Sequence, residues 1–353
     1  MSTADVIDSH ESEHLLEVKD LEVSFFTRRG TVKAVRGVSF HVDRGETLGL
    51  VGESGSGKSV TSQAVLGMTE LPGKIVGGEI LWKGRSLLDG RKGAKYIQSI
   101  RGKEMAVVFQ DPMTSLNPVF TIGMQLTEVL RYHLHMSRRD ANERAADLLD
   151  LVGIPFPRQR LKQHPHEFSG GMRQRVLIAM ALACEPELLI ADEPTTALDV
   201  TIQAQILDLL ADLQSRLGLA VMLITHDLGV VAGLCHRVQV MYAGRLVEDG
   251  PSSELFDEPC HPYTAGLLRS TPRLDVVMPR LTAIEGSPPD LLHPPSGCAF
   301  HPRCPLATDR CAAEVPELEV VRPGRAAACY RPFEINGVEG YERHGAVPAG
   351  AHG

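Results

Sequence analysis

The chain has 353 residues, a length that suits one large domain together with a smaller one. Hydrophobic residues make up 43% of the sequence and aromatic residues 5%, which favours an aliphatic α/β core over an aromatic-rich β-sandwich. The formal net charge of -8 argues against nonspecific nucleic-acid binding, because such binding needs a basic face. No apolar run approaches the ~20 residues that a membrane-spanning helix needs.

Residues 1–14 are polar and are expected to form a mobile arm. This arm is acidic and lacks the basic and apolar regions of a signal peptide, so we expect a cytosolic protein. In the cytosol, the seven cysteines fit thiols or metal ligands better than disulfides. Strands are predicted over 16–25 and 38–42. Phe25 and Phe26 are each either a core aromatic or a stacking partner for a nucleotide base, and Phe25 is the preferred stacking candidate.

The segment 52–59 reads GESGSGKS and matches the pattern G-x-x-x-x-G-K-[ST]. An apolar run over 47–51 predicts a buried strand before it, and 60–68 predicts a helix after it. In such a loop, backbone N–H groups point at a phosphate at the positive end of the helix dipole. Lys58 would reach the β- and γ-phosphates, and Ser59 would bind Mg²⁺. The alternative interpretation of this segment is a glycine-rich turn that contains a lysine by chance. The predicted nucleotide contacts are Gly52, Ser54, Gly55, Ser56, Gly57, Lys58, Ser59 and Val60.

The next part of the chain contains a strand over 77–82 and a Lys/Arg/Gly-rich loop up to about residue 95. An apolar strand over 106–109 ends in Gln110. A helical insert of about fifty residues follows, from about 112 to 166, with a capping box at Ser137 and Asp140.

A helix is predicted from 168 to 182 and another from 202 to 217. The apolar runs 187–191 and 220–224 lack polar alternation, as expected of central parallel strands that are buried on both faces. A hairpin over 237–248 completes this part of the chain.

Polar residues follow three of these predicted strands. Asp192, with Ser59, is predicted to hold Mg²⁺, and Glu193 is predicted to orient and polarise the attacking water. Gln110 would contact the metal or the water, and His226 a γ-phosphate edge. A lone glutamine or histidine at a strand end is more often structural, so these two assignments rest on the whole set.

In this order the motifs resemble the nucleotide-binding subunits of ABC transporters, over about residues 15–250. The resemblance makes 52–59 the Walker A loop, Gln110 the Q-loop, 188–193 Walker B and His226 the switch histidine. It implies an α/β fold with a P-loop ABC ATPase core, in which a mixed or parallel sheet accompanies an antiparallel β part. A nucleotide-binding domain over 15–255 would carry the helical subdomain.

The segment from 168 to 174 resembles the ABC signature, although Phe168 and Met172 replace the leucine and the glutamine of the commonest LSGGQ form. The serine hydroxyl and the glycine N–H groups remain. The resemblance implies that two such subunits sandwich two ATP molecules, so that hydrolysis separates the dimer and drives a permease between conformations. The residues implied to act at the dimer interface are Ser169, Gly170, Gly171 and, in the D-loop, Asp199.

Proline becomes frequent after about residue 252, which indicates a loop-rich module over 256–333, before a tail over 334–353 that is expected to be disordered. The sequence HPYT at 261–264 resembles the C-terminal region of oligopeptide/dipeptide importer ATPases. Three longer motifs resemble those of the first of the two nonidentical ATPase subunits of such importers: GESGSGKS at 52–59, FQDPMTSLNP at 109–118 and FSGGMRQRVLIAMAL at 168–182.

Four cysteines of this module lie within 32 residues, at intervals of five, six and seventeen residues. Cysteines in a proline-rich segment with little core of its own fit a metal staple. Because some relatives carry a [4Fe–4S] cluster on cysteines placed like these, iron–sulfur ligation is preferred, with zinc or free thiols as alternatives. The four candidates are Cys298, Cys304, Cys311 and Cys329. The other three, Cys184, Cys235 and Cys260, are expected to be buried or spare thiols.

The resemblance therefore implies an ATP hydrolase that energises import of di- or oligopeptides from the cytoplasmic side of the cell membrane. Its implied cofactors are ATP and Mg²⁺. Its implied partners are a homologous second ATPase, two membrane permeases and an extracytoplasmic peptide-binding protein, with no nucleic acid. The alternatives are an importer of nickel or another small solute and a soluble ABC ATPase of DNA repair or translation.

Overall fold

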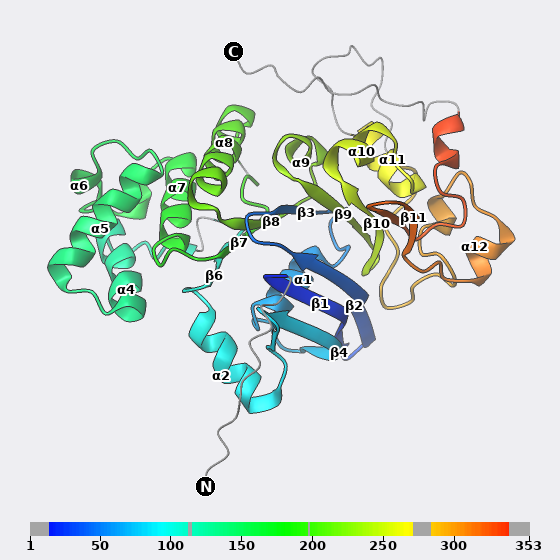
Figure 1. The fold of residues 1–353 in the computed structure, drawn as a ribbon, viewed down its shortest axis with the longest axis horizontal. Coiled ribbons are helices and arrows are strands. Elements are labelled where there is room, and N and C mark those ends of the chain that lie inside the picture. The colour runs from blue at the N-terminus through cyan, green and yellow to red at the C-terminus, as the bar shows by residue number, and fades with distance from the viewer. Residues whose placement is uncertain (1–13, 112–114, 197, 271–283, 339–353) are drawn as a thin grey trace, which may run out of the picture.

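The computed structural model describes residues 14–111, 115–196, 198–270 and 284–338 (Figure 1). Strands in this part of the chain form two sheets, in the orders β2-β1-β4-β5 and β11-β12-β10-β9-β3-β8-β7-β6. The first, antiparallel sheet contains β1 (Leu16–Thr27), β2 (Gly30–Val42), β4 (Gly73–Trp82) and β5 (Arg85–Ser86). The second contains β3 (Thr47–Val51), β6 (Met105–Val108), β7 (Leu188–Asp192), β8 (Ala220–Thr225), β9 (Arg237–Tyr242), β10 (Arg245–Pro251), β11 (Glu319–Arg322) and β12 (Arg325–Ala327).

Five neighbouring strands of the larger sheet run parallel, from β9 through β3, β8 and β7 to β6 at its edge. Every residue of β3, β7 and β8 is buried, as their uninterrupted apolar runs predict. Val51 pairs with Thr225, and Asp192 pairs with Ile224, so the carboxyl ends of these strands meet at one edge. The loops that follow the strands therefore meet there as well.

The antiparallel sheet packs on α1 (Lys58–Val65) and shares one hydrophobic core with β3, β7 and β8. The predicted mixed α/β architecture with an antiparallel part is therefore confirmed. One local expectation is wrong, because the predicted basic loop up to residue 95 contains most of α2 (Gly90–Ile100). Gly93, Ile97 and Ile100 lie at helical spacing and are buried, so an apolar face outweighs the two glycines of this helix.

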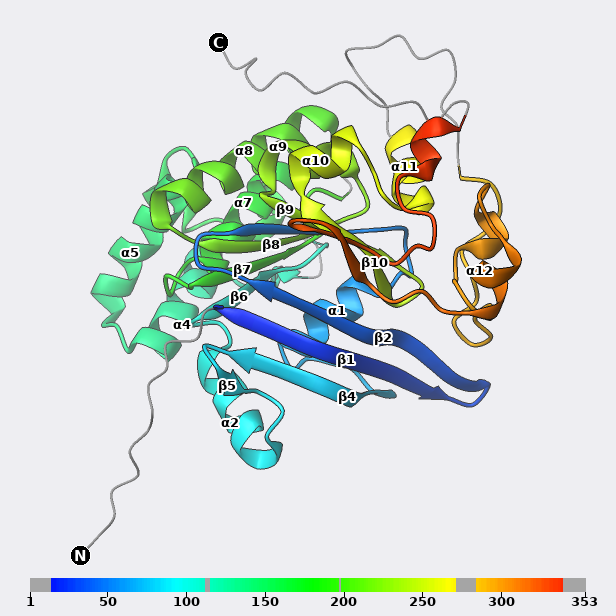
Figure 2. The same cartoon turned by 45° about the vertical axis from the view of Figure 1, so that its right-hand side comes forward.

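A second core lies between the helices and the β6–β7 edge of the large sheet. Thr121 and Ser137 cap α4 and α5 through their side-chain oxygens, as the sequence predicts for Ser137. Figures 1 and 2 show these two helices at the opposite end of the molecule from α12. The helices of this region are α4 (Ile122–Leu134), α5 (Arg138–Leu151), α6 (Pro157–Arg160), α7 (Gly170–Ala181) and α8 (Val200–Leu217), with a 3₁₀ turn over Pro165–Glu167.

The C-terminal region extends the large sheet, because β12 pairs antiparallel with β10. A third core joins Val51 and Val238 of the parallel strands to Tyr263 and Phe300 of this region. The C-terminal region therefore packs as a continuation of the part of the chain that forms the large sheet. Its helices are α11 (Pro262–Ser270) and α12 (Asp309–Ala313), with 3₁₀ turns over His301–Arg303 and Glu334–Gly337, and α9 (Leu228–Leu234) and α10 (Ser252–Asp257) precede it in the chain.

The predicted disordered tail from 334 onward is wrong at its start. Ile335 is fully buried, and the Asn336 side-chain amide donates a hydrogen bond of 3.1 Å to the Pro259 carbonyl. The rest of the tail, 339–353, and residues 1–13 of the predicted arm lie outside the described residues. His14, the last residue assigned to the arm, lies 2.6 Å from Asp43 through its Nδ1 atom.

Candidate functional site

The P-loop, residues 52–59, connects β3 to α1. Two of its glycines with positive φ lie close to the backbone of neighbouring segments. Gly52 has a φ of 155°, and a Cβ atom on it would lie 2.2 Å from the Met241 carbonyl oxygen. Gly57, with a φ of 109°, caps α1, and its Cβ would lie 2.5 Å from the Ala34 carbonyl oxygen. A larger residue at either position would displace the backbone, so the loop can run close to neighbouring strands only with glycine there.

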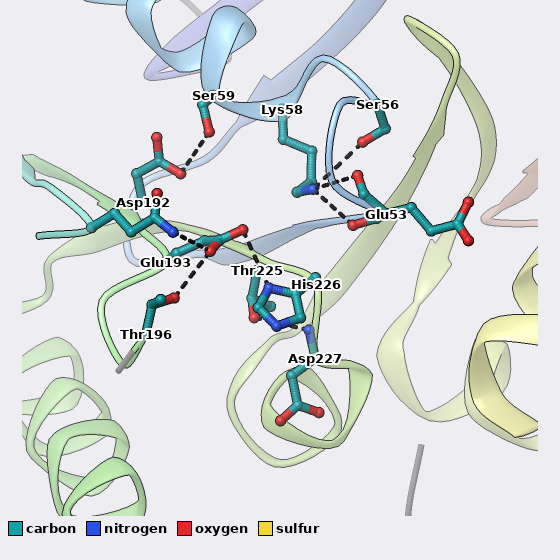
Figure 3. Close-up of polar contacts among 12 residues, drawn as sticks. Glu53, Ser56, Lys58, Ser59, Asp192, Glu193, Thr196, Thr225, His226 and Asp227 are labelled. Carbon is teal, nitrogen blue, oxygen red and sulfur yellow. Dashed lines mark hydrogen bonds and ion pairs between the residues drawn. The ribbon is translucent and has the colours of Figure 1, made fainter. Parts of the chain in front are cut away.

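Lys58 holds the P-loop together through its amino group. Its Nζ atom donates to the carbonyl oxygens of Gly52 at 2.7 Å and Glu53 at 3.0 Å (Figure 3). The side chain is buried, and this burial lowers the pKa of Lys58, while the nearby carboxylates of Glu193 and Asp192 oppose the shift. The ammonium group is thus positioned at the base of the loop, facing the acidic residues.

Two of the three predicted Mg²⁺ ligands, Ser59 and Asp192, lie side by side. The Ser59 hydroxyl donates to Asp192 Oδ1 at 3.1 Å, across the gap between α1 and the end of β7. Burial raises the pKa of Asp192, and the hydrogen bond from Ser59 opposes that shift. Oxygen donors of this kind suit a hard divalent cation such as Mg²⁺.

Glu193 follows β7 with a φ of 47°, and its carboxylate contacts three side chains, two of them from other segments and one from its own loop. Its Oε2 atom accepts hydrogen bonds from Gln110 Nε2 at 2.8 Å and from Thr196 Oγ1 at 3.0 Å. The Nδ1 atom of His226 lies 3.3 Å from Oε1 (Figure 3). The structure therefore brings Gln110, Glu193 and His226 together, as predicted. Thr196 was not predicted, although its position three residues after Glu193 in the same loop is a local signal.

These residues border a cavity of about 890 Å³. Its floor is the P-loop, and its rim carries Gln110, Glu193 and His226. One wall comes from the C-terminal region, which the sequence did not indicate. That wall contains Leu267, Ser270, Ile284, Gly286, Pro288 and Arg303.

The other predicted nucleotide contacts are distributed unevenly around this cavity. Ser54, Gly55 and Val60 line it, whereas Ser56 is buried beneath the loop, with its hydroxyl 3.5 Å from Lys58 Nζ. Phe25 packs against the core below the antiparallel sheet and does not occur among the described lining residues.

Two family models match the sequence, one described as ABC transporter over 35–196 and one as the C-terminal region of oligopeptide/dipeptide transporters over 247–311. The chain is 59% identical to the oligopeptide transport ATP-binding protein OppD of Bacillus subtilis (strain 168), over 81% of this chain and 80% of that protein. It is 51% identical to OppD of Escherichia coli (strain K12), over 92% and 95% of the two chains. The chain belongs to the oligopeptide/dipeptide ABC transporter ATPases.

A solved ABC protein has the same fold. The structure of cbiO1 from Clostridium perfringens, part of the ABC transporter complex cbiONQ, superposes with a TM-score of 0.59 at 29% identity, covering 69% of this chain and 91% of that one. The predicted ATP hydrolase activity and the predicted function in peptide-type ABC import are confirmed at the level of the family. Within the described residues, no helix is long and apolar enough to span a membrane.

The signature residues of this ABC ATPase lie away from its own P-loop. Ser169 caps α7 by accepting the Met172 N–H at 3.3 Å, and Asp199 caps α8 by accepting the Ile202 N–H at 3.0 Å. Ser169, Gly170 and Gly171 do not occur in the described lining of the nucleotide cavity. Gly171 packs against Ile202, where a Cβ atom would lie 2.5 Å from a methyl group.

The four cysteines of the C-terminal region line one small cavity of about 20 Å³. Burial raises the pKa of Cys298, that of Cys304 to about 11 and that of Cys329 to about 12. In the described part of the chain, no three of these sulfur atoms all lie within 4.8 Å of one another. Cys184, Cys235 and Cys260 are buried elsewhere, as expected.

Proposed function

We propose that this ATPase hydrolyses ATP in the cavity above the P-loop, with Glu193 as the residue that activates water. The convergence of Gln110, Thr196 and His226 on the Glu193 carboxylate, at the rim of that cavity, carries the proposal. A general base must be held within hydrogen-bonding reach of the water that it deprotonates. These three partners fix the carboxylate, and His226 would also contact the edge of the γ-phosphate.

The P-loop and the end of β7 would hold the triphosphate and its metal ion. Lys58 would bind the β- and γ-phosphates, and the Ser59 and Asp192 oxygens, 3.1 Å apart, would join Gln110 as oxygen ligands of Mg²⁺. When bound, Mg²⁺ supplies neutralisation of the charge that develops on the phosphates during in-line attack. Ser54, Gly55 and Val60 would contact the nucleotide along the cavity floor.

The signature residues would complete the site of a second, homologous ATPase subunit. Ser169, Gly170 and Gly171 lie at the start of α7, where a helix N-terminus favours phosphate, and they lie outside the described lining of this chain's own cavity. Asp199, at the start of α8, would lie at the same dimer interface. Each composite site would therefore need both subunits.

The substitution Ser169→Ala tests this arrangement. Binding of Mg-ATP by the purified full chain should stay at the wild-type level, because the serine acts in the partner's site. Turnover by the assembled transporter should fall on the order of 100-fold at that site, because a donor to the transferring phosphate is lost. Lys58→Ala is the matched control and should abolish ATP binding by the full chain. Weakened ATP binding by the isolated Ser169→Ala chain would contradict the two-subunit site.

The subunit would act at the cytoplasmic face of the membrane on two permeases, which receive di- or oligopeptides from an extracytoplasmic binding protein. The permeases would dock on the Gln110 loop and on the helical insert, where a groove of about 1080 Å³ on α4 and α5 supports a docking surface. Met124 and Tyr132 line this groove with 54% and 75% of their surface exposed, so a partner could bury apolar area there.

The four cysteines would hold a [4Fe–4S] cluster. A tetrahedral zinc site with Zn–S bonds of about 2.3 Å draws its sulfurs to within about 3.8 Å of one another, whereas no three of these sulfurs in the described residues all lie within 4.8 Å of one another. A cluster is larger than a single ion and accepts more widely spaced thiolates. When bound, the cluster would staple together the loops around α12 that carry the four cysteines.

A further inference from the structure

The P-loop glutamate, Glu53, is held by the C-terminal region. Arg303 donates to both carboxylate oxygens of Glu53, from Nη1 at 2.7 Å and from Nη2 at 3.0 Å. The Glu53 backbone N–H donates to the Tyr263 hydroxyl at 2.7 Å, and its carbonyl oxygen accepts from Lys58. Figure 3 shows the Glu53 side chain extending away from the Lys58 amino group. The first turn of the P-loop is thus fixed by two elements that lie more than 200 residues later in the chain.

Arg303 is itself rigidly placed. Its side chain is 5% exposed, its Nε atom donates to the Glu285 carbonyl oxygen at 2.9 Å, and Nη1 lies 3.3 Å from the Tyr242 hydroxyl. Its guanidinium group lies 5.9 Å from the centres of the Tyr242 and Phe300 rings. A guanidinium group is charged at every physiological pH. A bidentate pair held in this way fixes both position and charge.

The charge of Glu53 matters because it lies in a loop that binds a triphosphate. An unpaired carboxylate lining this cavity would repel the phosphates, whereas the paired one is neutralised by the guanidinium group. Lys58 is left to interact with the nucleotide. We propose that Arg303 is a positioning residue that neutralises Glu53 and fixes the first turn of the P-loop, so that the C-terminal region sets the affinity of this cassette for ATP.

The inference rests on the nucleotide site proposed above and is tested by charge compensation. In the purified full chain, Arg303→Gln should weaken binding of a fluorescent ATP analogue with Mg²⁺ about tenfold, because one uncompensated charge now faces the phosphates. The double variant Glu53→Gln with Arg303→Gln should recover most of this loss, because the neutral amide needs no counter-charge. Glu53→Gln alone should bind about as tightly as the double variant, because both lack the carboxylate and the bidentate pair that fixes the loop.

A matched control comes from the same region. Arg310 also pairs with a glutamate, Glu314 at 2.9 Å, but on α12 and outside the described lining of the nucleotide cavity. Arg310→Gln should leave ATP binding unchanged. In the assembled transporter, Arg303→Gln should raise KM for ATP and leave kcat nearly unchanged, because Arg303 acts on the nucleotide site through its pair with Glu53.

Two results would overturn the inference: wild-type ATP affinity in Arg303→Gln, or a double variant no tighter than Arg303→Gln alone. If Arg303→Gln does not fold, Arg303→Lys keeps the charge but loses the bidentate geometry. It should bind ATP with intermediate affinity at an unchanged melting temperature, and wild-type affinity in it would also overturn the inference. Normal ATP binding by Lys58→Ala would instead reject the proposed nucleotide site itself.

Discussion

Glu193 is the residue whose placement the fold constrains most. Its backbone lies in the left-handed region, which is uncommon for a side chain longer than that of asparagine. Its N–H donates to the Ile224 carbonyl oxygen at 2.8 Å, and its carboxylate contacts the side chains of Gln110, His226 and, in its own loop, Thr196. Each hydrogen bond to a charged group is worth about 1.5–3 kcal/mol. The carboxylate is therefore oriented before substrate arrives.

At the same scale, Cys304→Ser tests the proposed cluster. The full chain purified without oxygen should be brown and contain iron and inorganic sulfide in equal amounts. The variant should lose most of both, because a serine hydroxyl is a poor ligand for a [4Fe–4S] cluster. Iron content and visible absorbance are the measurements.

Cys184→Ser is the control for this experiment. Cys184 is buried between α7 and β7, away from the cavity that the four cysteines line, so its replacement should leave the iron content unchanged. Colourless wild-type protein that holds stoichiometric zinc would contradict the iron–sulfur proposal.

The sequence predicts residues at strand ends well, because polar side chains after buried strands must gather at one edge of a parallel sheet. Asp192, Glu193 and His226 were found in this way. Arg303 was not, since nothing near it in the sequence signals a contact with a loop 250 residues away. The sequence also cannot assign a role to Phe25, because core packing and base stacking both favour an aromatic residue at that position.

At the scale of elements, a buried glutamate joins α11 to the large sheet. Glu248 of β10 is fully buried and accepts the N–H groups of Cys260 at 2.8 Å and His261 at 2.9 Å. Arg325 of β12 donates to the same carboxylate at 3.0 Å. Removing one partner of a buried ion pair typically costs about 3–5 kcal/mol, so the β10–β12 contact and the start of α11 stabilise each other.

The pH dependence of stability should arise in part from His261 at the start of α11. Burial lowers its pKa from 6.5 to about 3, and its Nδ1 atom accepts the Tyr263 N–H at 3.0 Å. Below pH 6.5 the unfolded chain therefore binds a proton that the folded chain does not. The free energy of unfolding decreases by about 1.4 kcal/mol for each unit by which the pH is lowered in this range. The free energy of unfolding should drop by about 2 kcal/mol between pH 6.5 and 5 from this group alone.

The substitution His261→Asn removes this titration while keeping an acceptor for the N–H two residues on. Its melting temperature should depend less steeply on pH between 7 and 5 than that of the wild type. His293→Asn is the control, because that side chain is 81% exposed, and its pH dependence should match the wild type. Identical pH profiles for His261→Asn and wild type would contradict this assignment.

Two elements show where local sequence patterns mislead. The segment of α2 contains two glycines and four basic or polar residues among its first seven, which indicates a loop, yet three buried positions at helical spacing make it a helix. Burial of Ile335 likewise orders the turn over Glu334–Gly337. In both cases a few apolar contacts with distant segments outweigh the local propensity.

At the scale of the whole molecule, the parallel strands lie between two peripheral regions. α4 and α5 lie beyond β6, and the cysteine-rich region lies beyond β10 (Figure 1). The Gln110 loop reaches the nucleotide cavity on one side, and six residues of the C-terminal region, Arg303 among them, line it on the other. Changes at the cavity are therefore linked by direct contacts to both ends of the molecule.

The sequence predicts this overall architecture because the motifs occur in a fixed order and each lies next to a recognisable strand or helix. It does not predict that β12 joins the main sheet, because Arg325–Ala327 is a strand of three residues with little apolar pattern. The contact between the C-terminal region and the P-loop follows from that pairing and from the shared core around Tyr263 and Phe300.

ATP turnover by the assembled transporter that carries Glu193→Gln is the most direct test of the account, with the exposed Glu79→Gln as the control. The variant should bind Mg-ATP like the wild type, because the amide fits the same space. It should lose hydrolysis at this site by about 100-fold or more, because the amide cannot accept a proton from water. Full hydrolysis by the Glu193→Gln complex would contradict the role of Glu193.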